Sequence, residues 1–218
     1  LHHYCERIKI GGEPVAESLV CEAFAAIDQA RGDISLTYFE FGTLAALWIF
    51  SQRNIPYVAL EVGLGGRLDA VNIVDADIAV VTSIAIDHEE WLGRDREQIA
   101  REKLGVTRTN CPVVIAEEHL TNSLREFVTK HRQSSDVSVI NEQFSAKLEG
   151  QSLWRWQYRE ASHSLPLPSL PLNSVAAAME ALALGDLLPD IAQCHQVLST
   201  LSLAGRYQQQ CIGNRTVI

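Results

Sequence analysis

Two side chains that could bind a metal ion each stand at the end of an apolar run. Glu61 is the last residue but one of the run IPYVALEV, and Asp87 with His88 follows residues 78–86, IAVVTSIAI. Such runs predict buried strands, and neighbouring parallel strands present their carboxyl ends at one edge of a sheet, where ligands bind. If these strands are neighbours, a carboxylate and an imidazole meet in one crevice. The carboxylate suits Mg²⁺, while the imidazole leaves Zn²⁺ and Mn²⁺ open.

Each of these residues also has an ordinary structural explanation. A carboxylate at a strand end is most often a solvated charge, and a single histidine is most often a surface residue or a satisfied core residue. The placement of Glu61 and His88 after separate apolar runs, with a glycine-rich loop beside Glu61, favours a site.

The loop after Glu61 has three glycines within four residues, Gly63, Gly65 and Gly66. It is not a dinucleotide-binding GxGxxG, because Leu68 takes the third glycine position, and the chain contains no GxxxxGK[ST] phosphate loop. Glycine permits positive φ and close approach of the backbone to a ligand. We therefore expect the loop to contact a ligand together with its polar side chains, Arg67, Asp69 and Asn72. A plain tight turn is the alternative.

Two helix ends hold further candidates. TYFE, Thr37 to Glu40, reads as a capping box in which the threonine and the glutamate satisfy each other's backbone amides. The ordinary role of a capping box is to stabilise the helix start. A role of this helix start in ligand binding is equally open. Lys103 lies in REKLG near a helix C-terminus, where most lysines are solvated and favour the helix dipole.

Composition limits the class of protein. The chain has 218 residues with a formal net charge of −9, and 47% of its residues are hydrophobic. The charge argues against a general nucleic-acid or membrane-surface role, and no run of about 18 apolar residues is present to span a bilayer. The five cysteines are scattered without a CxxC pair, as is typical of reduced cytoplasmic thiols.

The elements that must position these residues alternate along the chain. A short strand is expected in CERIKI with GGEP as its turn, and apolar strands at IPYVALEV, residues 78–86 and CPVVIAEE. Apolar residues at helical spacing predict helices at residues 17–30, 37–53, about 95–105, about 120–131, 173–187 and 188–203. After His131, VSVI, FSAKLEG and SLWRWQYREA suggest short antiparallel strands, followed by the connector SLPLPSLPLN.

These patterns predict an α/β fold. Strands that alternate with helices favour a mostly parallel, doubly wound sheet with flanking helices, and the later strands add a small antiparallel β portion at about 136–165.

In order along the chain, the motifs resemble one family. The chain resembles the bifunctional dihydrofolate synthase/folylpolyglutamate synthases in six features: TYFE, LEVGLGGRLDAVNIV, TSIAIDH, WLG with REK, an Asn opening an Ala-rich helix and a late AGR. These are the folate branch of the Mur-ligase superfamily. The resemblance runs from Leu1 to Ile218, and related cell-wall ligases share the architecture without the LEVGLGGRLDA string.

The resemblance implies a function and site residues. The family reaction is ATP-dependent addition of L-glutamate to dihydropteroate and to folates through an acyl phosphate, with Mg²⁺, in cytoplasmic folate biosynthesis. The partners are thus small molecules, with no nucleic acid and no membrane, and the protein is expected to be a monomer. The matching positions are Glu61 and His88 for Mg²⁺, Lys103 as a carbamylated lysine in the catalytic site, Thr37, Tyr38, Phe39, Glu40, Leu68, Asp69 and Ala70 for dihydropteroate, and Asn173 and Arg206 for ATP.

The resemblance also implies a domain plan. Residues 1–206 match an incomplete central ATP-binding domain, and residues 207–218 match the start of a connection to a C-terminal domain. We expect the family's P-loop, of the GTNGKGT kind, and a Mg²⁺-binding serine to precede Leu1, so the 218 residues alone are expected to be inactive. Two substitutions are mild departures: Val71 stands where the family usually has Thr, and Leu104 where it usually has Ala.

Two alternatives remain at this point. A non-catalytic relic that retains a pterin pocket would bind pteroate without Mg²⁺, whereas the joint presence of Glu61, His88 and Lys103 favours an enzyme. A cell-wall Mur-type amino-acid ligase is the alternative among enzymes, and TYFE and LEVGLGGRLDA weigh against it.

Overall fold

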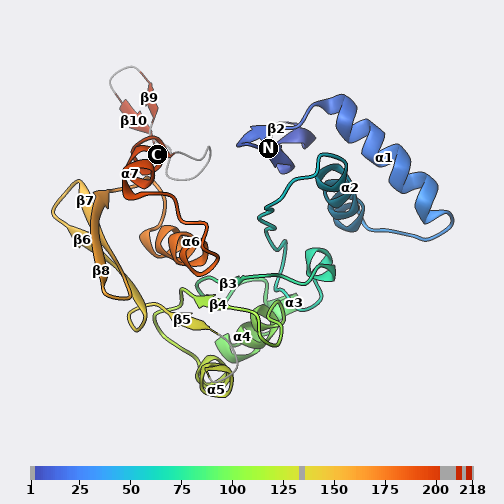
Figure 1. Ribbon diagram of the computed structural model, residues 1–218. Coiled ribbons are helices and arrows are strands. Elements are labelled where there is room, and N and C mark those ends of the chain that lie inside the picture. The colour runs from blue at the N-terminus through green and yellow to red at the C-terminus, as the bar shows by residue number, and fades with distance from the viewer. Residues whose placement is uncertain (1–2, 133–135, 202–209, 213–214, 218) are drawn as a thin grey trace. The chain divides into compact units, whose positions relative to one another are not determined.

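The computed structural model describes residues 3–132, 136–201, 210–212 and 215–217. The chain forms two compact units, Leu1–Val74 and Asp75–Ile218, and each is described by itself (Figure 1).

The first unit is a small helical unit with a β-hairpin. Its regular elements are the 3-10 helix η1 (Tyr4–Arg7), strands β1 (Lys9–Ile10) and β2 (Glu13–Pro14), helices α1 (Glu17–Arg31) and α2 (Tyr38–Gln52), and the 3-10 helix η2 (Ala70–Ile73). Gly11 and Gly12 form the hairpin turn at φ of 62° and 87°, a conformation that favours glycine. The hairpin confirms the GGEP turn, but the first half of the expected CERIKI strand belongs to η1, and only Lys9 and Ile10 form β1.

The core of the first unit lies between its two long helices. Apolar side chains recur at helical spacing on α1 and α2, so each helix buries one stripe. The buried members of this core are Ile8, Val15, Leu19, Val20, Ala23, Ala45 and Ile49. Both long helices lie where the periodicity predicts them.

The strand expected at IPYVALEV does not form. Residues 55–62 have no strand partner among the described residues, and the side chains of Tyr57 and Val58 are 68% and 43% exposed. A strand exists only through hydrogen bonds to a neighbour. Glu61 therefore follows irregular extended chain, and its expected place at a strand end is wrong.

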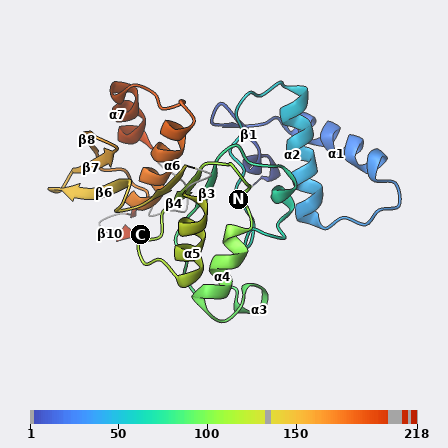
Figure 2. The ribbon, with the colours of Figure 1, turned by 60° about the horizontal axis from the view of Figure 1, so that its bottom comes forward.

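The second unit contains a three-stranded parallel sheet with helices on both faces. Its strands are β3 (Ala79–Val81), β4 (Val113–Ile115) and β5 (Val137–Val139), in the order β3-β4-β5. Helices α4 (Arg96–Leu104) and α5 (Asn122–His131) lie on one face, and α6 (Leu172–Leu184) lies on the other (Figures 1 and 2). This arrangement confirms the doubly wound α/β fold class.

Residue alternation along β4 explains why both faces are covered. Val113 and Ile115 belong to the core shared with α4 and α5, whereas Val114 belongs to the core shared with α6. Successive side chains of a strand point to opposite faces, so a fully apolar strand requires cover on both. Leu104, one of the two family departures, packs at the edge of the first of these cores.

An antiparallel sheet follows, with α6 and α7 against it. Its elements are β6 (Phe144–Glu149), β7 (Leu153–Tyr158), β8 (Ala161–Pro166) and α7 (Ile191–Thr200), and a further hairpin joins β9 (Gln210–Ile212) to β10 (Arg215–Val217). Trp154 and Trp156 are fully buried on β7.

Two expectations need correction in this region. VSVI is β5 of the parallel sheet, because its residues pair with β4 in parallel register. The connector SLPLPSLPLN begins later than expected, since its first three residues belong to β8, whose Pro166 ends the strand.

Across the described residues, no helix combines the length and apolar character needed to cross a bilayer. Cys5, Cys21, Cys111 and Cys194 are free thiols, as the scattered spacing predicts.

Candidate functional site

The glycine-rich loop of the first unit is organised by Asp69. Its carboxylate accepts hydrogen bonds from the backbone N–H groups of Leu64, at 2.9 Å, and of Val71, at 3.0 Å. Asp69 is also the N-cap of η2. The carboxylate thus holds the loop in shape, and Val71 contributes through its backbone, whichever side chain stands there.

The loop lies against the TYFE segment. A Cβ built on Gly63 would come within 2.8 Å of Cζ of Phe39, so glycine is required for this approach. The structure therefore brings together two of the segments predicted to hold dihydropteroate. Leu68 is 80% exposed beside this contact and remains available to a ligand.

The start of α2 has the predicted capping box. Glu40 accepts from the backbone N–H of Thr37 at 2.6 Å, and Thr37 Oγ1 accepts from the backbone N–H of Glu40 at 3.2 Å. The hydrogen bonds from Thr37 lower the pKa of Glu40 below its usual value. This carboxylate is therefore committed to the helix start.

Tyr4 and Arg7, which the sequence did not single out, lie beside the predicted residue Tyr38 at this helix start. The rings of Tyr4 and Tyr38 meet edge to face with centroids 5.6 Å apart, and the Arg7 guanidinium lies 5.8 Å from the Tyr38 ring. A Cβ on Gly42 of α2 would come within 2.2 Å of the Tyr4 hydroxyl, so this glycine admits Tyr4. Tyr38 itself stays 66% exposed.

His88 stands on the loop that follows β3. β3 ends at Val81, so His88 lies farther from the strand than the apolar run suggested. It adopts the left-handed conformation at φ 50°, immediately before the short helix α3 (Glu89–Leu92). Its Nε2 lies 3.8 Å from Oδ2 of Asp87, and its side chain is 58% exposed. An exposed imidazole beside a carboxylate can bind a metal ion.

Lys103 is half-buried on α4. Burial lowers the pKa of its amine, and the negative charge of Glu117 opposes that effect. Burial thus favours the neutral amine, which is the form that reacts as a nucleophile.

Glu117 is a site candidate that sequence reasoning missed. Its side chain is only 7% exposed at the carboxyl end of β4, and it forms an ion pair with Arg96 at 3.0 Å. The signal was present in CPVVIAEE, because the same rule that selected Glu61, an acid after an apolar run, applies to Glu117.

Asn173 lies in the first turn of α6, which begins at Leu172 after Pro171. Its side-chain amide donates to Oε1 of Glu118 at 2.8 Å, so it is tied to the segment after β4. The other predicted ATP-binding residue, Arg206, lies outside the described residues.

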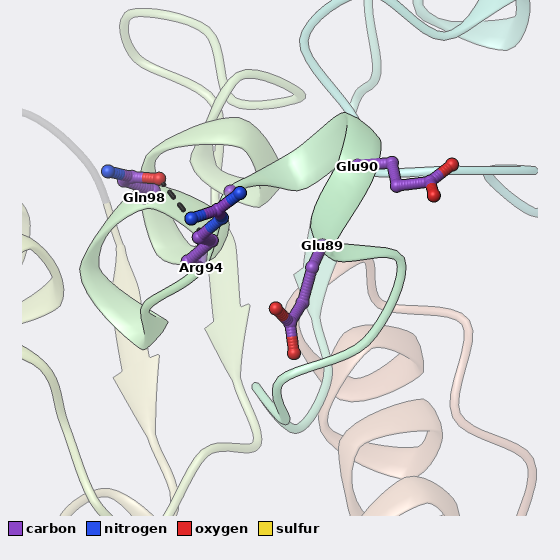
Figure 3. Close-up of a pocket in the computed structure, with 5 residues that line it drawn as sticks. Glu89, Glu90, Arg94 and Gln98 are labelled. Atoms are coloured by element: carbon purple, nitrogen blue, oxygen red, sulfur yellow. Dashed lines mark hydrogen bonds between the residues drawn. The ribbon is translucent and has the colours of Figure 1, made fainter.

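A surface hollow of about 460 Å³ lies beside α3 and is lined by Glu89, Glu90, Gly93, Arg94 and Gln98. Figure 3 shows the side chains of Glu89 and Glu90 pointing in different directions, while the backbone N–H of Arg94 donates to Gln98 Oε1 at 3.2 Å. None of the predicted site residues lines this hollow.

The two predicted metal ligands belong to different units. Glu61, in the first unit, is exposed, and His88 lies in the second. Within the part of the chain that the structure describes, no group of three or more histidine, cysteine or acidic side chains is arranged to hold a metal ion. The meeting of Glu61 and His88 stays a prediction.

Comparisons with known proteins complete the description of the site. No family model matches the chain. Among curated relatives, the dihydrofolate synthase/folylpolyglutamate synthase of Escherichia coli K12 is 41% identical over 95% of this chain and 49% of its own length. The Haemophilus influenzae protein of that name is 41% identical over 95% of this chain and 47% of its own length. The chain thus spans about half the length of these curated relatives.

Solved structures give the same result. E. coli FolC in complex with DHPP and ADP matches with a TM-score of 0.88 and 40% identity, over 95% of this chain and 50% of that one. The bifunctional folylpolyglutamate synthase/dihydrofolate synthase from Yersinia pestis, complexed with AMPPNP and a Mn ion, matches with a TM-score of 0.87 and 42% identity, over 95% of this chain and 50% of that one.

Proposed function

The chain belongs to the bifunctional dihydrofolate synthase/folylpolyglutamate synthase family, and we propose that the protein containing it ligates L-glutamate to dihydropteroate and to folates at the expense of ATP. The observation that carries the proposal is 41% identity to the E. coli relative over 95% of the chain. The E. coli structure holds DHPP and ADP, and the Y. pestis structure holds AMPPNP and a Mn ion. We place this activity in the cytoplasm, in a monomer that acts on small molecules.

The proposed reaction has two steps, phosphoryl transfer and amide formation. A carboxylate oxygen of the pteroate or folate attacks the γ-phosphorus of ATP, so that ADP leaves and an acyl phosphate forms. The amino group of L-glutamate then attacks the acyl carbon, an amide bond forms, and inorganic phosphate leaves while the amine gives up a proton. Phosphoryl transfer of this kind depends on positioning and on neutralising charge more than on covalent help from the protein.

The first unit supplies the pterin site in this proposal. The exposed ring of Tyr38 and the exposed side chain of Leu68 offer apolar contact to a planar ligand. Asp69 and the capping box hold these two segments in place through backbone hydrogen bonds. In this proposal Tyr38 and Leu68 contact the ligand, whereas Asp69 and the capping box hold their segments in place.

The residues present fit a hard divalent cation. Glu61 and His88 are exposed. The carboxylate oxygen of Glu61 suits Mg²⁺ or Mn²⁺, and the imidazole nitrogen of His88, a less usual ligand of Mg²⁺, is also compatible with Mn²⁺ or Zn²⁺. When bound, the cation would neutralise charge that develops on the transferred phosphoryl group. Lys103, half-buried with a lowered pKa, is suited to carbamylation, which requires the neutral amine and converts a cation into an anion. Asn173 and Arg206 are the proposed ATP contacts, and both belong to the second unit.

The proposal is tested on the full-length product of the gene that encodes this chain. Purified protein is incubated with ATP, Mg²⁺, L-glutamate and either dihydropteroate or a reduced folate, and phosphate release is measured alongside product mass. We expect glutamate-dependent phosphate release and a product heavier by one glutamyl residue, and the loss of both in Glu61→Ala. Phosphate release with a UDP-linked sugar peptide instead of a pterin would contradict the folate assignment.

A further inference from the structure

An ion pair between a buried carboxylate, Glu117, and a partly exposed guanidinium, Arg96, stands at the carboxyl end of β4, among residues with no assigned role. The Glu117 carboxylate accepts from the backbone N–H of Ile84 at 2.6 Å and from that of His119 at 2.7 Å. Nη2 of Arg96 lies 3.0 Å from Oε1 of Glu117. A carboxylate that is 7% exposed is costly to bury without such partners.

The same ion pair closes the loop that carries His88. Arg96 Nε donates to the backbone carbonyl of Ile84 at 2.9 Å, and Nη2 donates to that of His119 at 2.9 Å. Both backbone polar groups of Ile84 are therefore held, the N–H by Glu117 and the carbonyl by Arg96. Ile84 and Arg96 are the two ends of the segment that includes Asp87, His88 and α3. The ion pair and its hydrogen bonds therefore hold both ends of this segment together.

The neighbouring residues connect the pair to the other candidates in this unit. Arg96 is the first residue of α4, the helix that carries Lys103. Glu118, next to Glu117, accepts the side-chain hydrogen bond of Asn173. The loop of His88, the helix of Lys103 and the start of α6 thus converge on the segment that follows β4.

We propose that Arg96 and Glu117 are positioning residues that hold the His88 loop and the start of α4 in the geometry needed for metal binding. This inference rests on the proposed function, since it takes His88 as a metal ligand. Neither residue touches the ion in this account. The forked guanidinium is required because it reaches Ile84 through Nε and His119 and Glu117 through Nη2, whereas an ammonium group has all its donors on one nitrogen.

The alternative is an ion pair that only stabilises the fold. Removing either partner should destabilise the protein whether the pair positions the His88 loop or only stabilises the fold. A lower melting temperature therefore does not distinguish these two roles. Metal affinity does, because a partner that orients a ligand changes affinity typically by about 10–100-fold.

The experiment uses the full-length product of the gene that encodes this chain. Mn²⁺ affinity is measured by electron paramagnetic resonance of free Mn²⁺, in the presence of AMPPNP, so that no turnover is needed. We expect Glu117→Gln to weaken Mn²⁺ binding about 10–100-fold. The matched control is Glu149→Gln, which breaks the exposed Glu149–Arg155 ion pair on the antiparallel sheet and should leave Mn²⁺ affinity unchanged.

A double-mutant cycle assigns the effect to His88. In a His88→Ala background, Glu117→Gln should have little further effect, because the ligand that it positions is gone. If Glu117→Gln prevents folding, Arg96→Lys replaces it in the cycle, since it keeps the charge beside Glu117 while losing the fork, and the same weakening is expected.

The outcomes separate the two proposals. A large effect of His88→Ala with unchanged affinity in Glu117→Gln and Arg96→Lys would overturn the positioning role alone. Equal weakening by Glu117→Gln with and without His88 would also overturn it. Unchanged affinity in His88→Ala would overturn the metal assignment made under the proposed function, and the positioning role with it.

Discussion

At the scale of single residues, Glu180 shows how burial changes the chemistry of a carboxyl group. It lies on α6 with 1% of its surface exposed, and Ser138 on β5 donates its hydroxyl to Oε1. Among the described residues, Oε2 has no hydrogen-bond partner. Burial raises the pKa of Glu180 from 4.5 to about 7, because the charged form loses its hydration.

This shift predicts a pH dependence of stability. Because the folded pKa is raised, the stabilisation is full below about pH 4.5, and it is lost as the pH rises towards 7. The total is roughly 3 kcal/mol, of which about 2 kcal/mol falls between pH 5.5 and pH 8. We expect Glu180→Gln, which stays neutral, to gain on the wild type by about 2 kcal/mol over that interval.

Urea unfolding of both proteins at the two pH values measures this difference. Other titrating groups affect both proteins alike, so the comparison isolates Glu180. If the free energy of unfolding changes with pH in the same way in both proteins, folding leaves the pKa of Glu180 unchanged, and the prediction is wrong.

At the scale of elements, helix ends connect the fold to the site. Thr37 caps α2 and lies in the predicted pterin segment, whereas Asp190 caps α7 with the same reciprocal capping box, completed by Gln193. One type of local structure thus serves two helices, of which only one borders the proposed pterin site.

Replacing either cap separates stability from binding. We expect Thr37→Ala and Asp190→Ala each to lower the free energy of unfolding by about 1 kcal/mol, because each leaves backbone N–H groups of the first turn unsatisfied. Only Thr37→Ala should raise KM for dihydropteroate in the full-length gene product. Steady-state kinetics and urea unfolding of both variants test this, and an equal rise of KM in Asp190→Ala would refute the local role of Thr37.

At the scale of the whole molecule, the metal assignment depends on both compact units. Glu61 lies in the first unit and His88 in the second. If they share an ion, losing either ligand removes most of the affinity, and the second loss adds little.

We therefore expect strong coupling between Glu61→Ala and His88→Ala in the full-length gene product. Mn²⁺ affinity with AMPPNP should fall at least about tenfold in each single variant, and by less than the product of the two effects in the double variant, with a coupling energy of about 0.5–3 kcal/mol. Strictly multiplicative effects would show that the two residues act at separate places.

A second prediction at this scale concerns the 218 residues alone. The sequence contains no GxxxxGK[ST] phosphate loop, and within the described ranges no three ligands group around a metal position. We expect the 218-residue polypeptide to show no glutamate-dependent phosphate release. Release that disappears in His88→Ala would contradict this expectation.

Local patterns in the sequence were enough to predict much of the fold. Periodicity placed α1, α2, α4, α5 and α6, the capping box gave the first residue of α2, and the apolar runs gave β3 and β4. These features depend on residues close in sequence, so their physical cause is visible there. The TYFE segment and the glycine-rich loop each stood out in the sequence, but the contact between Gly63 and Phe39 is visible only in the structure.

Tertiary structure decided the features that depend on partners far away in the chain. Residues 55–62 have the sequence pattern of a strand, but among the described residues they have no strand to pair with. VSVI joins the parallel sheet because its residues pair with β4. An acid after an apolar run marks Glu117 in the sequence, but nothing there pairs it with Arg96, and only folding brings both side chains to Ile84. Hydrogen bonds between distant residues are energetically cooperative and have no local signature, which is why the helices could be predicted and the Arg96–Glu117 pair could not.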